Sequence, residues 1–206
     1  MQFVYVMDPM CGWCYGFQPE LDDFLAEHPA AELVWIMGGL APDSQTPMDE
    51  ALRETIASYW HQIEAKTRVT FNHEFWTRNT PYRSTYPACR AVIAAEQLQA
   101  GSARSMVKAI QSAYYREARN PALEATLIAC AGAIGFDEAA FAEVLASAET
   151  EQRFQQQLAL TRRLQVRGFP ALFFVDAEGR AYPLAMGYTP ADEMAQRLGR
   201  YLENTG

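Results

Sequence analysis

Short β-rich segments lie at both ends of the chain, and a long helical stretch separates them. Residues 3–7 and 32–37 are apolar and β-rich, and the apolar positions that start at Cys11 recur every three or four residues. That order predicts strand, helix and strand, with the length of one parallel crossover. Residues 171–176 and 181–186 predict two strands joined by a turn, and a last helix follows. We therefore expect an α/β protein.

The stretch between these two parts is predicted to be almost entirely helical. Helical patterns cover roughly residues 46–63, 87–100, 102–118, 122–134, 137–147 and 150–166. The first of these helices is expected to begin with Thr46 as N-cap and Pro47 in its first turn, whereas residues 69–75 are ambiguous. No linker-like composition flanks the stretch. We therefore expect residues 45–165 to form a helical insertion domain, between the first (1–44) and second (166–206) parts of one domain.

Charge and hydropathy narrow the range of partners. The chain of 206 residues has a formal net charge of −8 and shows no cluster of Lys and Arg. A phosphate backbone would not be attracted to such a protein, so no nucleic-acid partner is expected. No apolar stretch reaches transmembrane length, so no membrane partner is expected either. The N-terminal residues have no signal-peptide pattern, and we expect a cytoplasmic protein.

The sequence CGWC at residues 11–14 is the segment with the clearest chemistry. Zinc would need two further ligands, but Cys89 and Cys130 are isolated and no histidine has a paired spacing with a cysteine. A permanent staple across so short a loop would stabilise the fold little. Cys11, in contrast, would begin the helix, where free N–H groups favour a thiolate. We therefore expect a redox-active pair of Cys11 and Cys14, with no metal and no organic cofactor.

Two motifs resemble one family. Strand, CxxC and helix in this order resemble the thioredoxin-like proteins. The cysteine pair with Tyr15 and Phe17 resembles the start of the active-site helix of the DsbA-type thiol oxidoreductases, and Pro19 lies where thioredoxin has a helix-kinking proline. The sequence RGFPALFFVD, residues 167–176, resembles the cis-proline loop and following strand of the family.

The resemblance implies a fold and an activity. The fold is a thioredoxin-like βαβ…ββα arrangement with a large all-helical insertion. The implied activity is thiol–disulfide exchange with protein or small-molecule thiols and disulfides, glutathione among them. Cys11 would be the nucleophile and Cys14 the resolving thiol, while Phe169 and a cis Pro170 would pack against the pair and present backbone to the substrate. The direction of the reaction stays open.

Neighbouring residues are expected to support this site. Gly12 and Trp13 form the dipeptide that tunes the redox potential in this fold, and Trp13 is expected to face outward and contact substrate. Tyr15 is a supporting residue. Asp8 is interpreted either as a proton acceptor for the thiols or as part of a strand-end turn, and the turn is favoured. Cys89 and Cys130 are expected to be inert buried thiols.

Two other classes of function remain open. One is a binding protein similar to cytosolic protease adaptors, which would use the CxxC only as a redox sensor or zinc clip. The other is a glutathione-dependent transferase or isomerase. The isomerases of this kind usually have serine at the nucleophile position, so Cys11 argues against that class.

Overall fold

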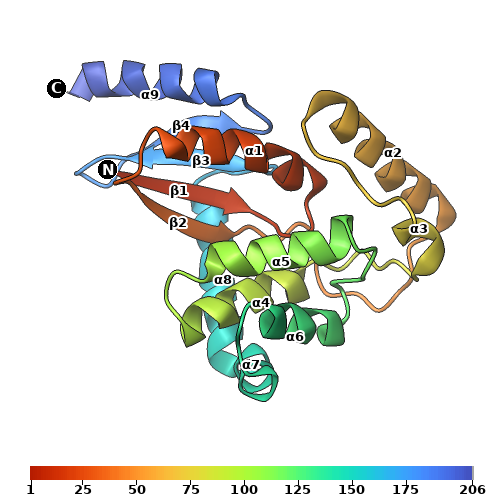
Figure 1. Ribbon diagram of the computed structural model, residues 1–206. Helices are drawn as coiled ribbons and strands as arrows, with labels where there is room; N and C mark the ends of the chain where they lie inside the picture. The colour runs from red at the N-terminus through yellow and green to blue at the C-terminus, as the bar shows by residue number, and fades with distance from the viewer. Residues whose placement is uncertain (206) are drawn as a thin grey trace.

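The computed structural model describes residues 1–205 of the protein, and it contains one sheet and a series of helices (Figure 1). In chain order the elements are β1 Gln2–Met7, α1 Gly12–Ala26, β2 Glu32–Met37, α2 Glu50–Lys66, α3 Phe75–Arg78, α4 Tyr86–Leu98, α5 Ala103–Tyr115, α6 Glu124–Ala133, α7 Glu138–Leu145, α8 Ala148–Arg163, β3 Ala171–Val175, β4 Ala181–Met186 and α9 Ala191–Thr205.

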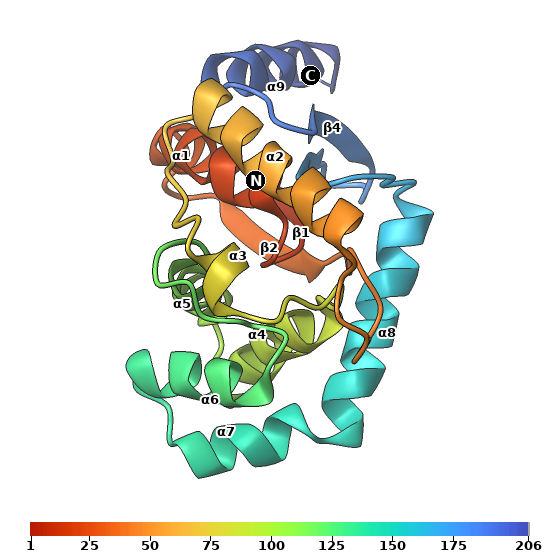
Figure 2. The same cartoon turned by 90° about the vertical axis from the view of Figure 1, so that its right-hand side faces the viewer.

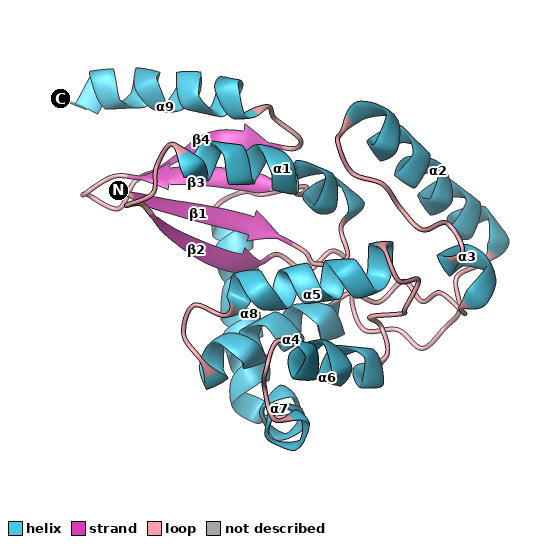
Figure 3. Ribbon diagram, in the orientation of Figure 1, coloured by secondary structure: helices cyan, strands magenta, loops and turns pink. Residues whose placement is uncertain are grey.

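The sheet has four strands in the order β2-β1-β3-β4 (Figure 3). β1 pairs with β2 in parallel and with β3 antiparallel, and β3 and β4 form an antiparallel hairpin. α1 is the crossover between β1 and β2, so the first part of the chain is the predicted βαβ unit. Both ends of the sequence therefore contribute to one mixed sheet, as the sequence predicts.

Alternate side chains of the sheet enter two separate apolar layers. Phe3, Tyr5 and Met7 join the main core, which α1 and α9 also enter. Val6 faces the other way and joins a smaller cluster that includes Leu160 of α8. This two-residue period is what a sheet covered on both faces requires. Figure 2 shows α8 on the opposite side of the sheet from α1.

The chain between β2 and β3 is helical, as predicted. Helices α4 to α7 pack on one another beside the sheet (Figures 1 and 2). α2 lies near the start of α1, and α3 contacts α5, where the Phe75 ring meets the Tyr114 ring edge-on. Within residues 1–205, no helix combines the length and the apolar character needed to span a membrane.

The predicted start of the first inserted helix is wrong. The N-cap of α2 is Asp49, whose side chain accepts a 2.8 Å hydrogen bond from the backbone N–H of Leu52. Thr46 lies outside the helix, and Pro47 pairs instead with Tyr82 in an isolated antiparallel bridge. Aspartate is as good an N-cap as threonine, and the bridge keeps the preceding residues extended. The ambiguous residues 69–75 form no strand and lead into α3.

Candidate active site

The CGWC segment lies where β1 ends and α1 begins. A tight turn follows β1, in which Cys11 N–H donates to the carbonyl oxygen of Asp8 at 3.0 Å and Met10 N–H to its carboxylate at 2.8 Å. Cys11 is the N-cap of α1, with extended backbone angles and no capping bond from its side chain. The sulfur is therefore next to the N-terminal end of the helix, where negative charge is stabilised.

The two thiols of the pair are free, and they differ in environment. Cys11 has 6% of its surface exposed, whereas Cys14, in the first turn of α1, has none. Burial is the main cause that raises the pKa of the Cys14 thiol well above its usual value, and the neighbouring Cys11 raises it further. A buried thiol resists ionisation because the thiolate loses its hydration. The pair thus combines Cys11, which keeps a small exposed area, with Cys14, whose thiol is protonated and enclosed.

The loop before β3 closes over Cys11. The Phe169–Pro170 peptide bond is cis, and Pro170 is buried. The Cys11 thiol donates to the carbonyl oxygen of Phe169, with 3.8 Å between sulfur and oxygen. The Pro170 carbonyl in turn accepts a 2.7 Å hydrogen bond from Gly187 N–H. Residues 158 positions apart in sequence are thereby in contact at the reactive sulfur.

Two glycines, Gly38 and Gly12, allow neighbouring side chains to pack closely around the cysteine pair. A Cβ on Gly38, after β2, would lie 2.1 Å from the Phe169 ring, so the ring rests directly on this backbone. A Cβ on Gly12 would lie 2.9 Å from the end of the Ile63 side chain and 3.9 Å from the Phe71 ring. The cis-proline loop can therefore approach the pair on one side, because Gly38 has no side chain. On the other side Ile63 of α2 and Phe71 form a wall beside the pair, and the absence of a side chain at Gly12 lets them approach it.

Trp13 is partly exposed, and neighbouring side chains cover part of its ring. Its ring lies tilted against Tyr188, with centroids 6.2 Å apart, and Lys66 Nζ lies 5.9 Å from the centroids of both rings. These contacts come from α2 and the loop after β4, which pack beside the start of α1. The Lys66 ammonium group therefore lies over the surface that the Trp13 and Tyr188 rings form beside the thiol pair.

Tyr15 lies on the wall next to the pair. Its ring stacks on that of Tyr115 with centroids 4.7 Å apart and meets the Phe71 ring edge-on. Its hydroxyl donates to the carbonyl oxygen of Thr70 at 3.4 Å. Tyr15 thus joins α1 to α5 and to the segment after α2.

Asp8 is completely buried beneath the pair. Besides Met10 N–H, its carboxylate accepts hydrogen bonds from Leu40 N–H at 2.7 Å, Thr85 Oγ1 at 2.6 Å and Cys89 Sγ at 3.4 Å. Burial raises the pKa of the Asp8 carboxyl above its ordinary value, although these four bonds act in the opposite direction. Asp8 is part of the strand-end turn and also the centre of a hydrogen-bond network.

Sequence reasoning missed two members of this network, Thr85 and Cys89. Both come from the start of α4, 77 and 81 positions after Asp8. Neither belongs to a motif, and Cys89 was expected to be an inert thiol in an alanine-rich helix. Burial raises its pKa well above the usual value, and the Asp8 charge adds to the effect.

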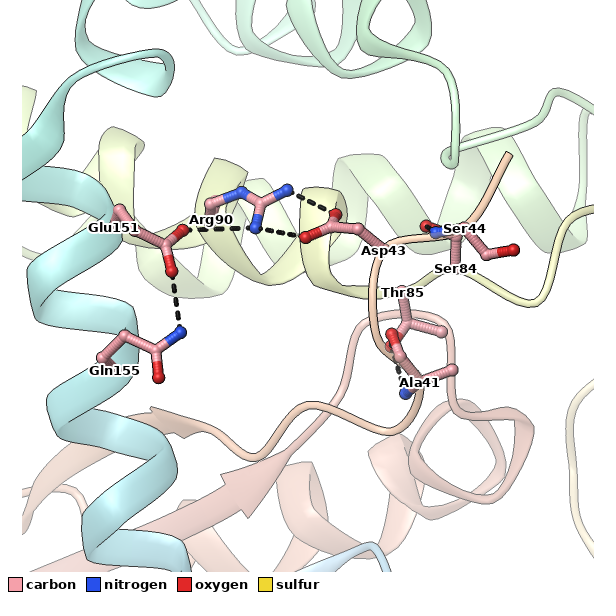
Figure 4. Close-up of polar contacts among 8 residues, drawn as sticks. All are labelled: Ala41, Asp43, Ser44, Ser84, Thr85, Arg90, Glu151 and Gln155. Carbon is pink, nitrogen blue, oxygen red and sulfur yellow. Dashed lines mark hydrogen bonds and ion pairs between the residues drawn. The ribbon is translucent and has the colours of Figure 1, made fainter. Parts of the chain in front are cut away.

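The helical insertion also holds the loop that follows β2. Ala41 N–H donates to Thr85 Oγ1 at 3.0 Å and Ser44 N–H to Ser84 Oγ at 3.1 Å. Arg90 of α4 pairs with Asp43 of the loop and with Glu151 of α8 (Figure 4). Leu40, which donates to Asp8, lies at the start of this loop. Contacts with α4 and α8 therefore fix the loop next to the buried carboxylate.

Comparison with known proteins shows which family this chain resembles in sequence. The sequence pattern of the DSBA-like thioredoxin domain matches residues 3–199. A comparison with curated protein sequences gives no match.

Solved structures with the same fold cover nearly the whole chain. A putative protein disulfide isomerase from Nitrosomonas europaea is 28% identical with a TM-score of 0.86, and the match covers 100% of this chain and 98% of that one. The cytosolic disulfide reductase DsbM from Pseudomonas aeruginosa is 27% identical with a TM-score of 0.80, over 98% and 99% of the two chains. A structure of DsbM with GSH gives a TM-score of 0.79 at 27% identity, over 98% and 100%. These matches confirm the thioredoxin-like fold with a helical insertion.

Proposed function

Because the chain belongs to the DSBA-like thioredoxin domain family, we propose that it is a thiol–disulfide oxidoreductase whose reactive pair is Cys11 and Cys14. The observation that carries the proposal is the position of the Cys11 sulfur. It lies at the N-terminus of α1 and 3.8 Å from the carbonyl oxygen that precedes the cis Pro170. A thiolate is the nucleophile in disulfide exchange, and a helix N-terminus favours it.

The reaction takes place in two exchanges at sulfur. The Cys11 thiolate attacks a substrate disulfide, so a mixed disulfide forms and the first substrate sulfur leaves as a thiolate that takes up a proton. The deprotonated Cys14 then attacks the Cys11 sulfur and displaces the second substrate thiolate. The substrate has gained two electrons and two protons, and the enzyme holds a Cys11–Cys14 disulfide. The same steps in reverse oxidise a dithiol.

Asp8 is proposed to help the second exchange. Burial raises the pKa of Cys14, and Asp8 lies close enough to interact with it electrostatically. Burial also raises the pKa of the Asp8 carboxyl, which is the change that makes a carboxylate a better proton acceptor. Asp8 therefore accepts the Cys14 proton while Thr85 and Leu40 N–H hold the carboxylate in place.

The substrate chain is proposed to lie along the cis-proline loop. Gly168, before Phe169, is exposed, and Pro170 has no N–H that would be left without a partner. Trp13, beside Lys66, provides an aromatic surface on the other side of Cys11. Gly12 and Tyr15 allow the Ile63 and Phe71 side chains to pack beside this surface.

The direction is proposed to be reduction, in the cytoplasm. Support comes from the likeness to a protein that is described as a cytosolic disulfide reductase, one structure of which holds GSH. Glutathione or a similar small thiol would then return the Cys11–Cys14 disulfide to the dithiol. A glutathione titration of the pair tests the direction. A potential near the value of about −270 mV for thioredoxin supports a reductase, whereas one near about −120 mV, as for DsbA, contradicts it.

Trapping of the intermediate tests the roles of the two cysteines. Cys14→Ala should stop the reaction at the mixed disulfide, so that substrates from a cell extract stay attached to Cys11 and are released by dithiothreitol. Cys11→Ala should trap far less. If all variants, including the double variant, retain the same partners in dithiothreitol, and no adduct is unique to Cys14→Ala, the protein is a binding adaptor instead.

A further inference from the structure

Two of the three histidines of the chain meet one carboxylate at α2 and the segment that follows it. His61 and Glu64 lie three positions apart on α2, so they share one face of the helix. Glu64 Oε2 lies 3.5 Å from His61 Nδ1 and 3.0 Å from His73 Nε2, and His73 comes from the segment after the helix. One potential ligand atom from each of the three residues lies within 4.8 Å of the other two.

The segment that carries His73 is fixed in this position. The second oxygen of Glu64, Oε1, accepts a 2.7 Å hydrogen bond from Phe71 N–H. Asn72 N–H donates to the Tyr115 carbonyl at 2.6 Å, and the His73 ring meets the edge of the buried Trp60. One oxygen of Glu64 is therefore directed at both imidazoles, while the other is held by the backbone of the segment that carries His73.

We propose that His61, Glu64 and His73 form a binding site for a single divalent transition-metal ion, Zn²⁺ in the first place. Two imidazoles and one carboxylate are a ligand set that zinc uses, and a water molecule completes the tetrahedron. The carboxylate neutralises part of the charge of the ion. Ligation requires one adjustment. The two rings are stacked with centroids 4.1 Å apart, whereas an ion lies in the plane of each imidazole that binds it, so the exposed His61 ring turns.

The ion would connect α2 to the segment that packs against the cysteine pair. Glu64 already holds Phe71, whose ring contacts Tyr15 of α1 and stacks on Trp60. Metal ligands from α2 and from the segment after it would hold these two parts together more strongly than the hydrogen bond between Phe71 N–H and Glu64 does alone. Bound metal should therefore stabilise the wall beside Gly12 without contact with the sulfurs.

The experiment has to separate this site from the thiols, which also bind zinc. The protein used is the full chain with Cys11→Ser and Cys14→Ser, titrated with Zn²⁺ by calorimetry and with Co²⁺ by absorption. We expect one equivalent to bind, with no thiolate-to-cobalt charge-transfer band, and the ring resonances of His61 and His73 to shift. Since even outer partners of metal ligands contribute roughly 10–100-fold to affinity, His61→Ala should weaken binding by at least about tenfold.

Matched variants decide the outcome. His61 is exposed, so its loss leaves the fold intact, and Glu64→Gln keeps an acceptor for Phe71 N–H while it removes the charge. Glu54→Gln, an exposed position on the same helix, removes an equal charge outside the cluster and should leave affinity unchanged. Failure of the Cys11→Ser, Cys14→Ser protein to bind either ion would overturn the site. An affinity in the His61→Ala and Glu64→Gln variants equal to that of this parent protein would overturn it as well. Neither result bears on disulfide exchange.

Discussion

The hydroxyl of Thr85 donates a 2.6 Å hydrogen bond to the buried carboxylate of Asp8, and it also accepts one from Ala41 N–H. One side chain from the start of α4 thus connects the group under the cysteine pair to the loop after β2. The helical insertion is therefore part of the environment of Cys14, because it provides two of the donors around Asp8. A hydrogen bond to a charged group contributes about 1.5–3 kcal/mol, which is enough to change the ionisation of that group.

Titration of Asp8 should be visible in the stability of the protein. Its pKa is raised above 3.8 in the folded state, so the folded chain keeps a proton that the unfolded chain has lost. The stabilisation from Asp8 is complete below the unfolded pKa and is lost as the pH rises through the folded pKa. The unfolding free energy of the wild type minus that of Asp8→Asn should therefore fall as the pH rises above about 4. Denaturant titrations over a pH series measure the difference.

Asp176 provides a control of opposite sign. Burial acts to raise its pKa, but hydrogen bonds from Arg180 and Tyr182 outweigh this and lower the value to about 2. Its stabilisation is present above the unfolded pKa and is lost as the pH falls towards 2. The wild type minus Asp176→Asn difference should therefore rise with pH in that window. Equal slopes for the two variants would contradict the assignment of Asp8.

Of the four thiols, that of Cys11 should react fastest with an alkylating reagent. Burial raises the pKa of Cys14 and of Cys89 well above the usual value, and that of Cys130 to about 11. These three thiols are therefore protonated near neutral pH. Cys11 lies at the helix N-terminus, and a larger fraction of its surface is exposed than in the other three cysteines. Cys11 should be alkylated first, as followed site by site with mass spectrometry. Faster modification of any other cysteine at neutral pH would refute its role as nucleophile.

The elements of the sheet could be predicted because their signals are local. Residues 32–37 coincide with β2, and residues 171–176 differ from β3 by one position, since an apolar β-rich run of that length has few alternatives. The cysteine pair and Pro170 were found through short motifs. The start of α2 was not, because Thr46 and Asp49 are both good N-caps and the choice depends on the bridge between Pro47 and Tyr82.

The network around Asp8 could not be predicted in the same way. Thr85 and Cys89 are ordinary residues at the beginning of an alanine-rich helix, and only the packing of α4 against the end of β1 gives them a common partner. The wall contacts of Trp13 have the same origin, because Lys66 and Tyr188 lie on elements far from it in sequence. A single sequence shows periodicity and motifs, whereas such tertiary contacts leave no local trace.

Gly38→Ala should damage the site through the Phe169 ring. The new Cβ would lie 2.1 Å from this ring, and the nearest atoms are rigid aromatic carbons, so the cis-proline loop has to move away. Overpacking of this kind costs about 1–3 kcal/mol. Both the free energy of unfolding and the rate of disulfide exchange should fall. Gly168→Ala, in the same loop, meets no atom within 4 Å and should leave the free energy of unfolding unchanged.

Lys66→Met should impair reaction with anionic small disulfides in particular. Lys66 Nζ lies 5.9 Å from the centroids of both Trp13 and Tyr188, so a positive charge borders the surface where a substrate would approach Cys11. Glutathione disulfide has a net negative charge at neutral pH, and an exposed ion pair contributes about 0.2–1 kcal/mol. Loss of the charge should therefore raise the KM for glutathione disulfide by roughly 1.5- to 5-fold.

Two comparisons separate this effect of Lys66 from a general loss of activity. A neutral disulfide should react with Lys66→Met at nearly the wild-type rate, because only the charge that attracts carboxylates is missing. Arg153→Gln removes an equal charge from α8, where Arg153 pairs with Glu149, and should leave both substrates unaffected. The difference between wild type and Lys66→Met should also shrink as salt is added, since the Debye length falls to about 3 Å at 1 M. A salt-independent defect that is equal for both substrates would mean that Lys66 acts through packing on Trp13 and Tyr188 rather than through its charge.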